Sequence, residues 1–409
     1  MAGHPDQVWV AGKALTQVSS ASAVKDGTFF VDRSGKRLII GTDPTGKTVE
    51  ASTLQKAIKV QGVNSTLRGF GVKRYATTLA QMGAVSTEVK GVTLENLVVT
   101  QNATVGIYAW NDGHAFRNLT VTENGLMGLG ANGANDMSIT ASDFSRNNAQ
   151  QFKWAPASGG IKITKSERVR IADNSFHDNR SIGLWLDVSS YDVDIVGNVV
   201  SGNPRYGIHF ELSAAGVIAD NYVYNNGRGI AIFNSERVDI WNNTVVGNNR
   251  TLEFMQDERR QEVSALASRI TWVTKDISVK NNVLSYGSDS CPILTQDLTK
   301  KWTGNQFGIT FDSNLYHRAT ASQPSNLVCW ANGADGTRSF KSLDAFRSHT
   351  GGDKNSASIE GTGVISSTYA PTSKAAGAGV KPTALTGALA SAIGTAKGTA
   401  KLGAISTYA

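Results

Sequence analysis

The sequence has little of several features that mark familiar classes of protein. Only two cysteines, eight prolines and 18% charged residues occur among its 409 positions. No stretch approaches the roughly 20 consecutive apolar residues of a membrane-spanning helix, so we expect no membrane insertion. Basic residues outnumber acidic ones by 40 to 33, which gives a net charge of +7, but no dense Lys/Arg block is interleaved with aromatics. We therefore expect no nucleic-acid partner.

Common catalytic and cofactor motifs are also missing. The sequence has no zinc-type Cys/His spacing, no phosphate-cradling glycine loop and no Gly-x-Ser-x-Gly elbow. We therefore predict neither a metal nor a cofactor.

The cellular compartment is only weakly indicated. Cys291 and Cys329 either form a disulfide or stay as two buried thiols, and cysteine usage does not decide between these. Residues 1–5 do not resemble a signal peptide. We expect a secreted protein whose leader is absent from this sequence, with a cytoplasmic start as the alternative.

What the sequence does contain is an internal repeat. A glycine opens a short apolar run with spacings of 22, 32, 23, 24 and 22 residues. An asparagine precedes each run, and a second asparagine series, Asn174, Asn198, Asn221 and Asn243, keeps the same step. Short strands with Gly and Asn corners at this period predict an all-β parallel solenoid. The leucine spacing of leucine-rich repeats is missing. The glycines are Gly106, Gly128, Gly160, Gly183, Gly207 and Gly229.

Each run alternates in a way that separates an inner from an outer face. Positions one and three after the glycine are apolar in all six runs, so strand periodicity sends them into the core. Positions two and four must then face outward. Position two reads Tyr108, Gly130, Lys162, Trp185, His209 and Ala231, and position four reads Trp110, Asn132, Thr164, Asp187, Glu211 and Phe233. This outer panel is too aromatic and too acidic for an ordinary wet surface.

The chain divides into three parts by pattern. Residues 1–58 read as a small N-terminal β cap that would shield the edge of the first coil. Coils follow over 59–286, with insertions at 148–159 and 249–272, and the Glu253–Glu262 run has the composition of a short exposed helix. Residues 287–409 read as C-terminal coils and an irregular tail. Both insertions are candidate walls of a site, or simple surface excursions.

The two acids of the panel carry the chemistry. Neighbouring coils stack about 4.8 Å apart, so the carboxyl groups of Asp187 and Glu211 are expected at roughly 5 Å. That separation matches retaining glycosidases, at about 5 to 5.5 Å, better than inverting ones. Close carboxylates repel, so one is expected to hold a proton while the other stays charged. The non-catalytic alternative for these two acids is a site that binds a cation.

The neighbours of the acids suit a sugar. Trp185, together with Trp110 or Trp154, offers an apolar plane for a pyranose ring. Lys162, His209 and Asn132 offer hydrogen bonds to hydroxyls or to a uronate. The alternatives are that Trp185 packs under a loop and that His209 only braces Glu211. Corner serines Ser166, Ser189, Ser213 and Ser235 are expected to form a structural ladder.

The chain resembles bacterial right-handed parallel β-helix proteins of the carbohydrate-active kind over roughly residues 90–285. The resemblance is carried by Gly159-Gly-Ile-Lys-Ile-Thr-Lys-Ser, Gly183-Leu-Trp-Leu-Asp, Gly207-Ile-His-Phe-Glu-Leu-Ser and Asp220-Asn221. It is most similar to β-helix glycoside hydrolases of family 120 and the related family 141. The family 120 resemblance implies that Asp187 is the nucleophile and Glu211 the acid/base.

Three functions therefore compete. The first is a retaining glycoside hydrolase or transglycosylase acting on a polysaccharide or oligosaccharide. The second is a polysaccharide lyase or uronate epimerase with Lys162 or His209 as the base. The third is a non-catalytic carbohydrate-binding β-helix that uses the aromatic panel alone.

Overall fold

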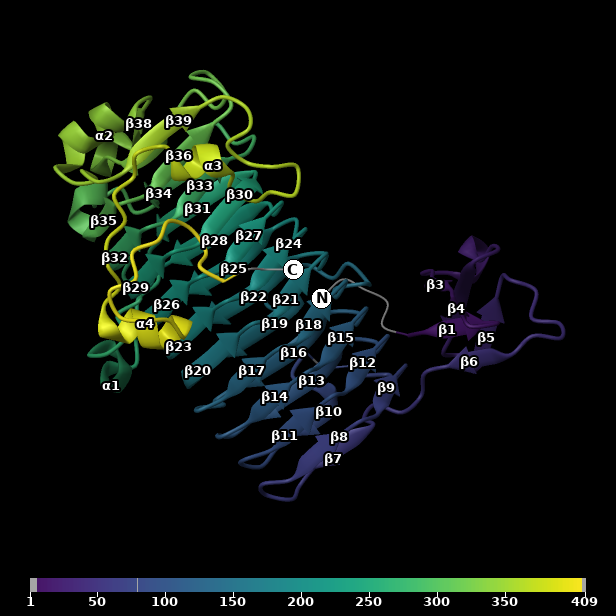
Figure 1. Cartoon of the computed structure of the whole chain (residues 1–409). Helices are drawn as coiled ribbons and strands as arrows, with labels where there is room; N and C mark the ends of the chain where they lie inside the picture. Colours follow the sequence, from purple (N-terminus) through teal and green to yellow (C-terminus); the bar gives the residue numbers. More distant parts are fainter. Residues whose placement is uncertain (1–5, 79, 407–409) are drawn as a thin grey trace.

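The computed structural model describes residues 6–78 and 80–406. Residues 1–5, which bear on the expected leader, lie outside the described part. The chain forms a long parallel β-helix with a small β domain at one side and a tail that runs along the coils (Figure 1). None of the helices in the described residues is both long and apolar enough for a membrane span.

The β-helix consists of three long sheets whose strands stack coil upon coil. Sheet 1 has 12 strands: β7 (Ile58–Val60), β10 (Gly83–Thr87), β13 (Val105–Trp110), β16 (Met127–Asn132), β19 (Gly159–Thr164), β22 (Ile182–Asp187), β25 (Tyr206–Glu211), β28 (Arg228–Phe233), β31 (Arg250–Gln256), β34 (Ile293–Asp297), β37 (Val328–Ala331) and β38 (Thr337–Phe340). All pair in parallel except β38, which is antiparallel to β37. Sheet 1 carries the outer panel.

Sheets 2 and 3 complete each coil. Sheet 2 has ten strands: β8 (Thr66–Arg68), β11 (Thr93–Glu95), β14 (Ala115–Arg117), β17 (Ser138–Thr140), β20 (Glu167–Ala172), β23 (Tyr191–Val196), β26 (Ala214–Ala219), β29 (Glu236–Trp241), β32 (Lys275–Lys280) and β35 (Ile309–Asp312). Sheet 3 has eleven: β9 (Gly71–Lys73), β12 (Val98–Thr100), β15 (Thr120–Thr122), β18 (Asp143–Ser145), β21 (Ser175–His177), β24 (Val199–Ser201), β27 (Tyr222–Tyr224), β30 (Thr244–Asn248), β33 (Val283–Tyr286), β36 (Leu315–Arg318) and β39 (Ala357–Glu360).

The interior of the coils confirms the predicted alternation. The residues one and three positions after each repeat glycine all belong to a single buried cluster that runs along the axis. Aromatic side chains stack from coil to coil in it, as Phe144 does on Phe176 at 5.2 Å between ring centroids. Burying such columns is the main stabilising term of a solenoid, because each coil covers the apolar face of the next.

Asparagine ladders hold the corners. The Asn174 side chain donates to Oδ1 of Asn198 at 3.1 Å, and Asn198 donates to Asn221 at 3.0 Å. Each of these amides also bonds a backbone carbonyl, such as that of Ile139 for Asn174. The buried amides are therefore satisfied, and they tie successive coils together as well as closing their own turns.

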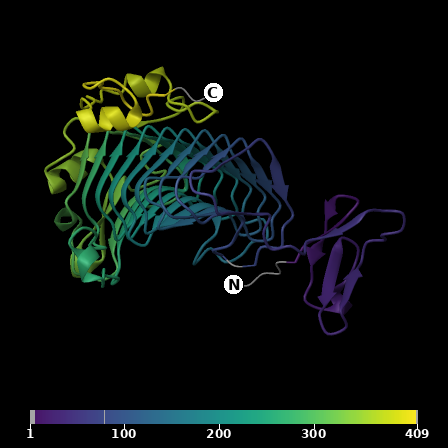
Figure 2. The same cartoon turned by 90° about the horizontal axis from the view of Figure 1, so that it is seen from below.

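The N-terminal residues form a domain with its own small core. It has two three-stranded sheets, β2 (Lys13–Ala14), β1 (Val8–Val10) and β6 (Val49–Ala51), and β3 (Thr16–Gln17), β4 (Thr28–Asp32) and β5 (Arg37–Ile40), with a 3-10 turn at Ala21–Ala23. It contacts a corner of the β-helix, where the Arg74 guanidinium lies 4.5 Å from the Trp9 ring centroid and pairs with Glu50. The domain stands beside the coils (Figure 2), and no strand in residues 6–78 and 80–406 pairs with the outer edges of β7, β8 and β9.

The expected helix in the second insertion is wrong in position. Arg250–Gln256 is strand β31 of sheet 1, and Glu253 is buried on it between Arg228 and Arg250. Its alternate apolar residues Leu252 and Phe254 belong to the core, and that pattern outweighs the helical composition of the run. The excursion therefore starts after Gln256, and its helix is α1 (Ser264–Ala267), only four residues long.

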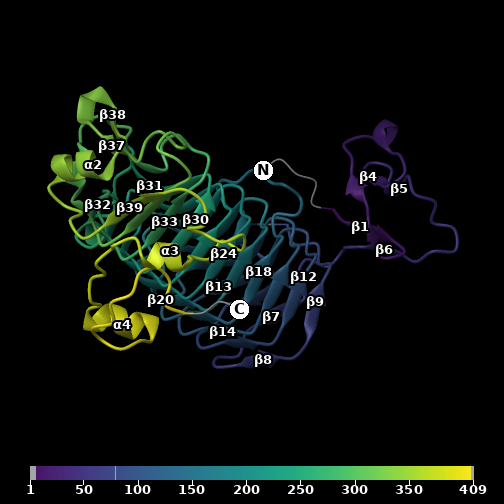
Figure 3. The same ribbon diagram turned by 45° about the horizontal axis from the view of Figure 1, so that its top comes forward.

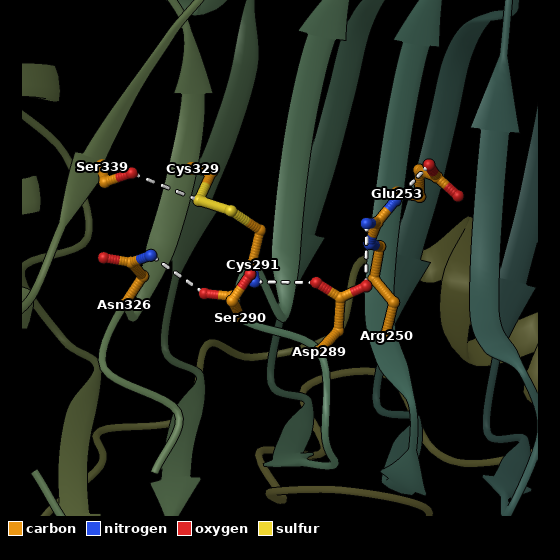
Figure 4. The surroundings of a disulfide bond; sticks show 8 residues. All are labelled: Arg250, Glu253, Asp289, Ser290, Cys291, Asn326, Cys329 and Ser339. Atoms are coloured by element: carbon orange, nitrogen blue, oxygen red, sulfur yellow. Dashed lines mark hydrogen bonds and ion pairs between the residues drawn. A yellow bond between two sulfur atoms is a disulfide. The ribbon is translucent and has the colours of Figure 1, made fainter. Parts of the chain in front are cut away.

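The last coils are closed by a disulfide. Cys291 and Cys329 are bonded; they are 38 positions apart in sequence, and their Cα atoms are 5.5 Å apart. Figure 4 shows the disulfide beside an ion pair between Arg250 and Asp289. The Asp289 carboxylate also accepts a hydrogen bond from the Cys291 backbone N–H at 2.8 Å. Helix α2 (Leu343–Thr350) and the 3-10 turns Gly304–Phe307 and Gly333–Asp335 complete this end.

The tail folds back over the coils as a strap. After α3 (Ser373–Ala376), Thr383 bonds Asn281, and helix α4 (Gly387–Ile393) packs beside Trp241 on sheet 2 (Figure 3). The Ser406 backbone then donates to Asp220 at 3.1 Å. The strap therefore spans several coils in the direction opposite to their growth.

Candidate functional site

Asp187 and Glu211 end two neighbouring strands of sheet 1. Strand β22 ends at Asp187 and β25 at Glu211, and the residues just before them, Leu186 and Phe210, are direct partners in the ladder. Leu186 and Phe210 point into the core, so the two acids point outward. Adjacent strands lie about 4.8 Å apart, which brings the two carboxyl groups together on one wall.

Asp187 is held by a lysine from the preceding coil. Lys162 Nζ lies 2.6 Å from Asp187 Oδ2, and the Val188 backbone donates to Oδ1 at 2.7 Å. Asp187 is only 6% exposed. Burial raises the pKa of the Asp187 carboxyl above its usual range; the nearby Lys162 ammonium opposes that rise, and the Glu211 charge adds to it.

Glu211 is held from both sides. The indole Nε1 of Trp185 donates to Oε2 at 3.0 Å, and Nη2 of Arg259, from the second insertion, lies 2.7 Å from Oε1. Glu211 is 5% exposed. Each acid therefore has its own cationic partner, and the close pair of negative charges is balanced by protein groups.

Trp185 does not offer an open plane to a sugar. It is only 2% exposed. The Lys162 ammonium lies 3.4 Å from its ring centroid, and Trp154 of the first insertion packs against it at 5.7 Å. Trp154 in turn is covered by the Arg205 guanidinium at 3.7 Å. The expectation that Trp185 offers an exposed platform for a pyranose is therefore wrong, because other side chains cover its ring, whereas Trp154 is half-buried.

His209 lies in an aromatic box next to Glu211. Its ring stacks on Tyr206 at 4.4 Å and on Trp185 at 5.5 Å, and the Phe233 ring meets it edge-on. Its Nε2 lies 3.8 Å from Glu211 Oε2, too far for a hydrogen bond, and neither ring nitrogen has a hydrogen-bond partner among residues 6–78 and 80–406. Burial lowers the pKa of His209 to about 3, so the imidazole is neutral.

The coil that carries Asp187 contains one extra residue. Ser166, Ser190, Ser213 and Ser235 occupy equivalent corner positions, just before the paired residues Glu167, Tyr191, Ala214 and Glu236. The prediction of Ser189 in this ladder is therefore wrong. Val188 and Ser189 both adopt left-handed backbone angles, with φ of 45° and 65°, and form a bulge directly after Asp187.

The displaced Ser189 anchors the second insertion. Its hydroxyl accepts from Gln261 Nε2 at 2.6 Å and from Trp272 Nε1 at 3.1 Å. Between these two anchor residues the insertion also pairs Arg269 with Glu167 at 3.1 Å. Arg259 and Ser189 are site residues that the sequence pattern missed, because neither lies in the repeating outer columns.

A cleft of about 290 Å³ adjoins Lys162 and Val188, and neither Asp187 nor Glu211 is among its lining residues. Its lining includes Lys162 and Asn132 from the predicted set, together with Tyr108, Met127, Thr164 and Val188. Trp110 does not belong to this lining and packs on Tyr108 at 5.0 Å. The structure thus groups Lys162, Trp185, His209, Asp187 and Glu211 closely, with Asn132 in the adjoining cleft and Trp110 farther along the sheet.

Comparison with known proteins supports the fold. Residues 83–250 match the family model described as the right handed beta helix region. The chain is therefore a right-handed parallel β-helix, as predicted, and its coils continue beyond both ends of that match. No curated protein matches the sequence.

Several solved structures are similar to this chain. The structure of XylC with xylose is 14% identical, with a TM-score of 0.58, and the alignment covers 77% of this chain and 65% of that one. The chain thus spans about two thirds of the length of XylC. The A-module of the mannuronan C-5 epimerase AlgE6 from Azotobacter vinelandii is 15% identical, with a TM-score of 0.45 and coverage of 73% and 82%. The Dettilon tailspike protein is 17% identical, with a TM-score of 0.43 and coverage of 64% and 49%.

Proposed function

We propose that this protein is a carbohydrate-active enzyme, and specifically a retaining glycoside hydrolase or transglycosylase in which Asp187 and Glu211 react. One observation carries the proposal: the two carboxylates end adjacent strands on the same outer wall, under two insertions. A pair of acids at about one strand spacing fits the separation of retaining enzymes.

The reaction has two steps. In the first, Asp187 attacks the anomeric carbon while Glu211 gives its proton to the departing glycosidic oxygen. In the second, Glu211 takes a proton from water or from an acceptor hydroxyl, whose oxygen displaces Asp187 from the sugar. Asp187 must be ionised to attack, and burial works against this. The Lys162 ammonium at 2.6 Å supplies the opposing charge.

The surroundings of Glu211 suit the other role. Once Glu211 has given up its proton, the resulting carboxylate meets the Trp185 N–H and the Arg259 guanidinium. Both donors stabilise the carboxylate, so they favour release of the proton in the first step and oppose the protonated form that precedes it. The similarity to XylC, whose structure contains xylose, supports a sugar as substrate through its fold.

The geometry favours this reaction over elimination or epimerisation. A lysine base needs a free amine, whereas the Lys162 ammonium is paired with Asp187 and donates to the Pro156 carbonyl at 2.6 Å. His209 is neutral, but the low pKa that burial gives it makes it a weak base. The Cys291–Cys329 disulfide suits a secreted enzyme.

The test is a panel of aryl glycosides and oligosaccharides with Asp187→Asn, Glu211→Gln and the wild type. We expect each variant to lose at least about a thousandfold in kcat while keeping its melting temperature. Azide should restore Glu211→Gln with a product of retained anomeric configuration, whereas azide rescue of Asp187→Asn should give the inverted one. The reverse pattern would exchange the two roles. Full turnover by Asp187→Asn would refute the proposal.

A further inference from the structure

Trp185 contacts one acid directly and the cationic partner of the other. Its indole N–H donates to Glu211 Oε2 at 3.0 Å. The face of the same ring carries the Lys162 ammonium, whose Nζ is 3.4 Å from the ring centroid and 2.6 Å from Asp187 Oδ2. A single buried side chain therefore bonds one carboxylate directly and holds the cation of the other.

We propose that Trp185 is a positioning residue that sets both carboxylates at once, Glu211 through its N–H and Asp187 through the Lys162 ammonium that rests on its ring. This proposal rests on the proposed function of the two acids. It gives Trp185 a role different from the sugar platform that its outward position predicted.

The ring itself is well fixed. Trp154 packs on it from the first insertion, and the His209 imidazole stacks on it from the next coil. Arg205 covers Trp154 on its far side. Because the ring is packed on these sides, its N–H keeps a fixed orientation, which a solvent-exposed indole would not. A hydrogen bond with a fixed orientation is also stronger in a buried site than in water.

The cation–π contact explains how a lysine serves as a precise partner for Asp187. A lysine stem is long and flexible, and its ammonium carries no preferred direction. Resting Nζ on an indole face removes much of that freedom, and such contacts are stronger when they are desolvated. The side chain of Lys162 is 11% exposed, so its contact with Trp185 belongs to the stronger class.

Several charged groups surround Asp187 and Glu211 and contribute to the pH dependence of the site. Lys162 and Glu211 act on Asp187 directly. Arg259, with Asp257 behind it, faces Glu211 from the second insertion. His209 is neutral above about pH 3, and other titratable or charged side chains nearby include Arg205, Tyr206, Arg228, Glu253 and Lys165.

Two substitutions separate the two contacts. Trp185→Phe keeps an aromatic face for Lys162 but removes the N–H, so we expect kcat to fall about tenfold with KM within about twofold, and the acid limb of the pH profile to stay in place. Trp185→Leu removes both contacts, so the Lys162 ammonium opposes the rise in the pKa of Asp187 less well. Because Asp187 must be ionised to attack, the acid limb should move to higher pH by about one unit, with a larger loss of kcat.

The chain offers a matched control. Trp241 is also buried, donates from Nε1 to Ser278 at 2.9 Å and carries Lys280 over its ring at 5.1 Å, but it lies on sheet 2. Trp241→Phe and Trp241→Leu should lower the melting temperature by amounts similar to the Trp185 variants and leave kcat and the pH profile unchanged.

A measurement without substrate keeps this inference separate from the proposed function. Carbon-13 NMR of labelled aspartate carboxyls should show the pKa of Asp187 rising in Trp185→Leu and in Lys162→Met, but not in Trp185→Phe. If the pKa of Asp187 rises in these two variants but the wild type turns over no substrate, the proposed function fails and the positioning role stands. If the wild type is active, and Trp185→Phe and Trp185→Leu both keep its kcat and acid limb, the positioning role is refuted. Should Trp185→Leu not fold, Lys162→Met and Trp185→Phe decide in the same way.

Discussion

Arg259 reaches from the second insertion to Glu211, with 2.7 Å between Nη2 and Oε1, and it also pairs with Asp257 of the same insertion at 2.8 Å. The insertion is thereby fixed to the acid pair by charge, and to the bulge after Asp187 by the hydroxyl of Ser189. A loop on one face of the solenoid thus completes a site that the coils begin.

Replacing Arg259 should impair the reaction more than the fold. In Arg259→Met the Glu211 carboxylate loses a charged partner, so we expect kcat to fall about ten- to a hundredfold. Arg260→Met is the control, because Arg260 is exposed and its guanidinium donates to the backbone carbonyls of Asp257 and Arg259 within the insertion. Steady-state kinetics on both variants check this, and equal kcat for Arg259→Met and the wild type would contradict it.

His209 should make stability depend on pH. Its pKa is about 3 in the folded state and about 6.5 when unfolded, so between these values the unfolded chain binds more protons. The free energy of unfolding should therefore fall as pH drops below about 6.5, by about 2 kcal/mol from pH 7 to pH 5 from this group. In His209→Phe, the free energy of unfolding measured in urea should fall by about 2 kcal/mol less between pH 7 and pH 5 than in the wild type. An unchanged pH slope would show that the imidazole is not buried neutral.

Val188 carries backbone strain beside Asp187. A β-branched residue at φ of 45° is unfavourable, whereas asparagine tolerates that region. We expect Val188→Asn to raise the free energy of unfolding by about 1 kcal/mol, measured in urea. Val188→Ala, which removes side-chain volume but keeps the left-handed penalty, should not give this gain. A loss of stability in Val188→Asn would mean that packing of the valine outweighs the strain.

The disulfide should stabilise the terminal coils. Bonding residues 38 positions apart restricts the unfolded chain by about 3 to 4 kcal/mol in the chain-entropy model. A Cys291→Ala, Cys329→Ala double variant should unfold earlier in urea by that amount, with hydrogen exchange increased first around β34 and β37. Unchanged exchange there would place the effect of the bond elsewhere.

The regular part of the structure could be predicted because it repeats. The spacing of 24 between Gly183 and Gly207 places Asp187 beside Glu211, and the apolar alternation sends Leu186 and Phe210 inward. Period and alternation are local properties of the sequence, and stacking turns them into long-range contacts.

The site's roof could not be predicted in this way. Arg259 and Trp154 come from insertions without periodicity, so their contacts depend on loop conformation. The bulge after Asp187 was hidden for a simpler reason: Ser189 and Ser190 are both serines, and a serine stands at the expected position whether or not a residue has been added. Trp185 faced outward as expected, but an outward direction does not distinguish an exposed ring from one that a loop covers.

The strap has a consequence for how the molecule comes apart. Contacts in a solenoid are mainly between neighbours, so its ends can fray one turn at a time. Here the strap runs back from Thr383, which contacts Asn281, to Ser406, which contacts Asp220. The final coils therefore cannot unfold separately until the strap is released. A single cleavage of the strap between Thr383 and Ser406 would allow the C-terminal coils to unfold one at a time. With the strap intact, these coils unfold together.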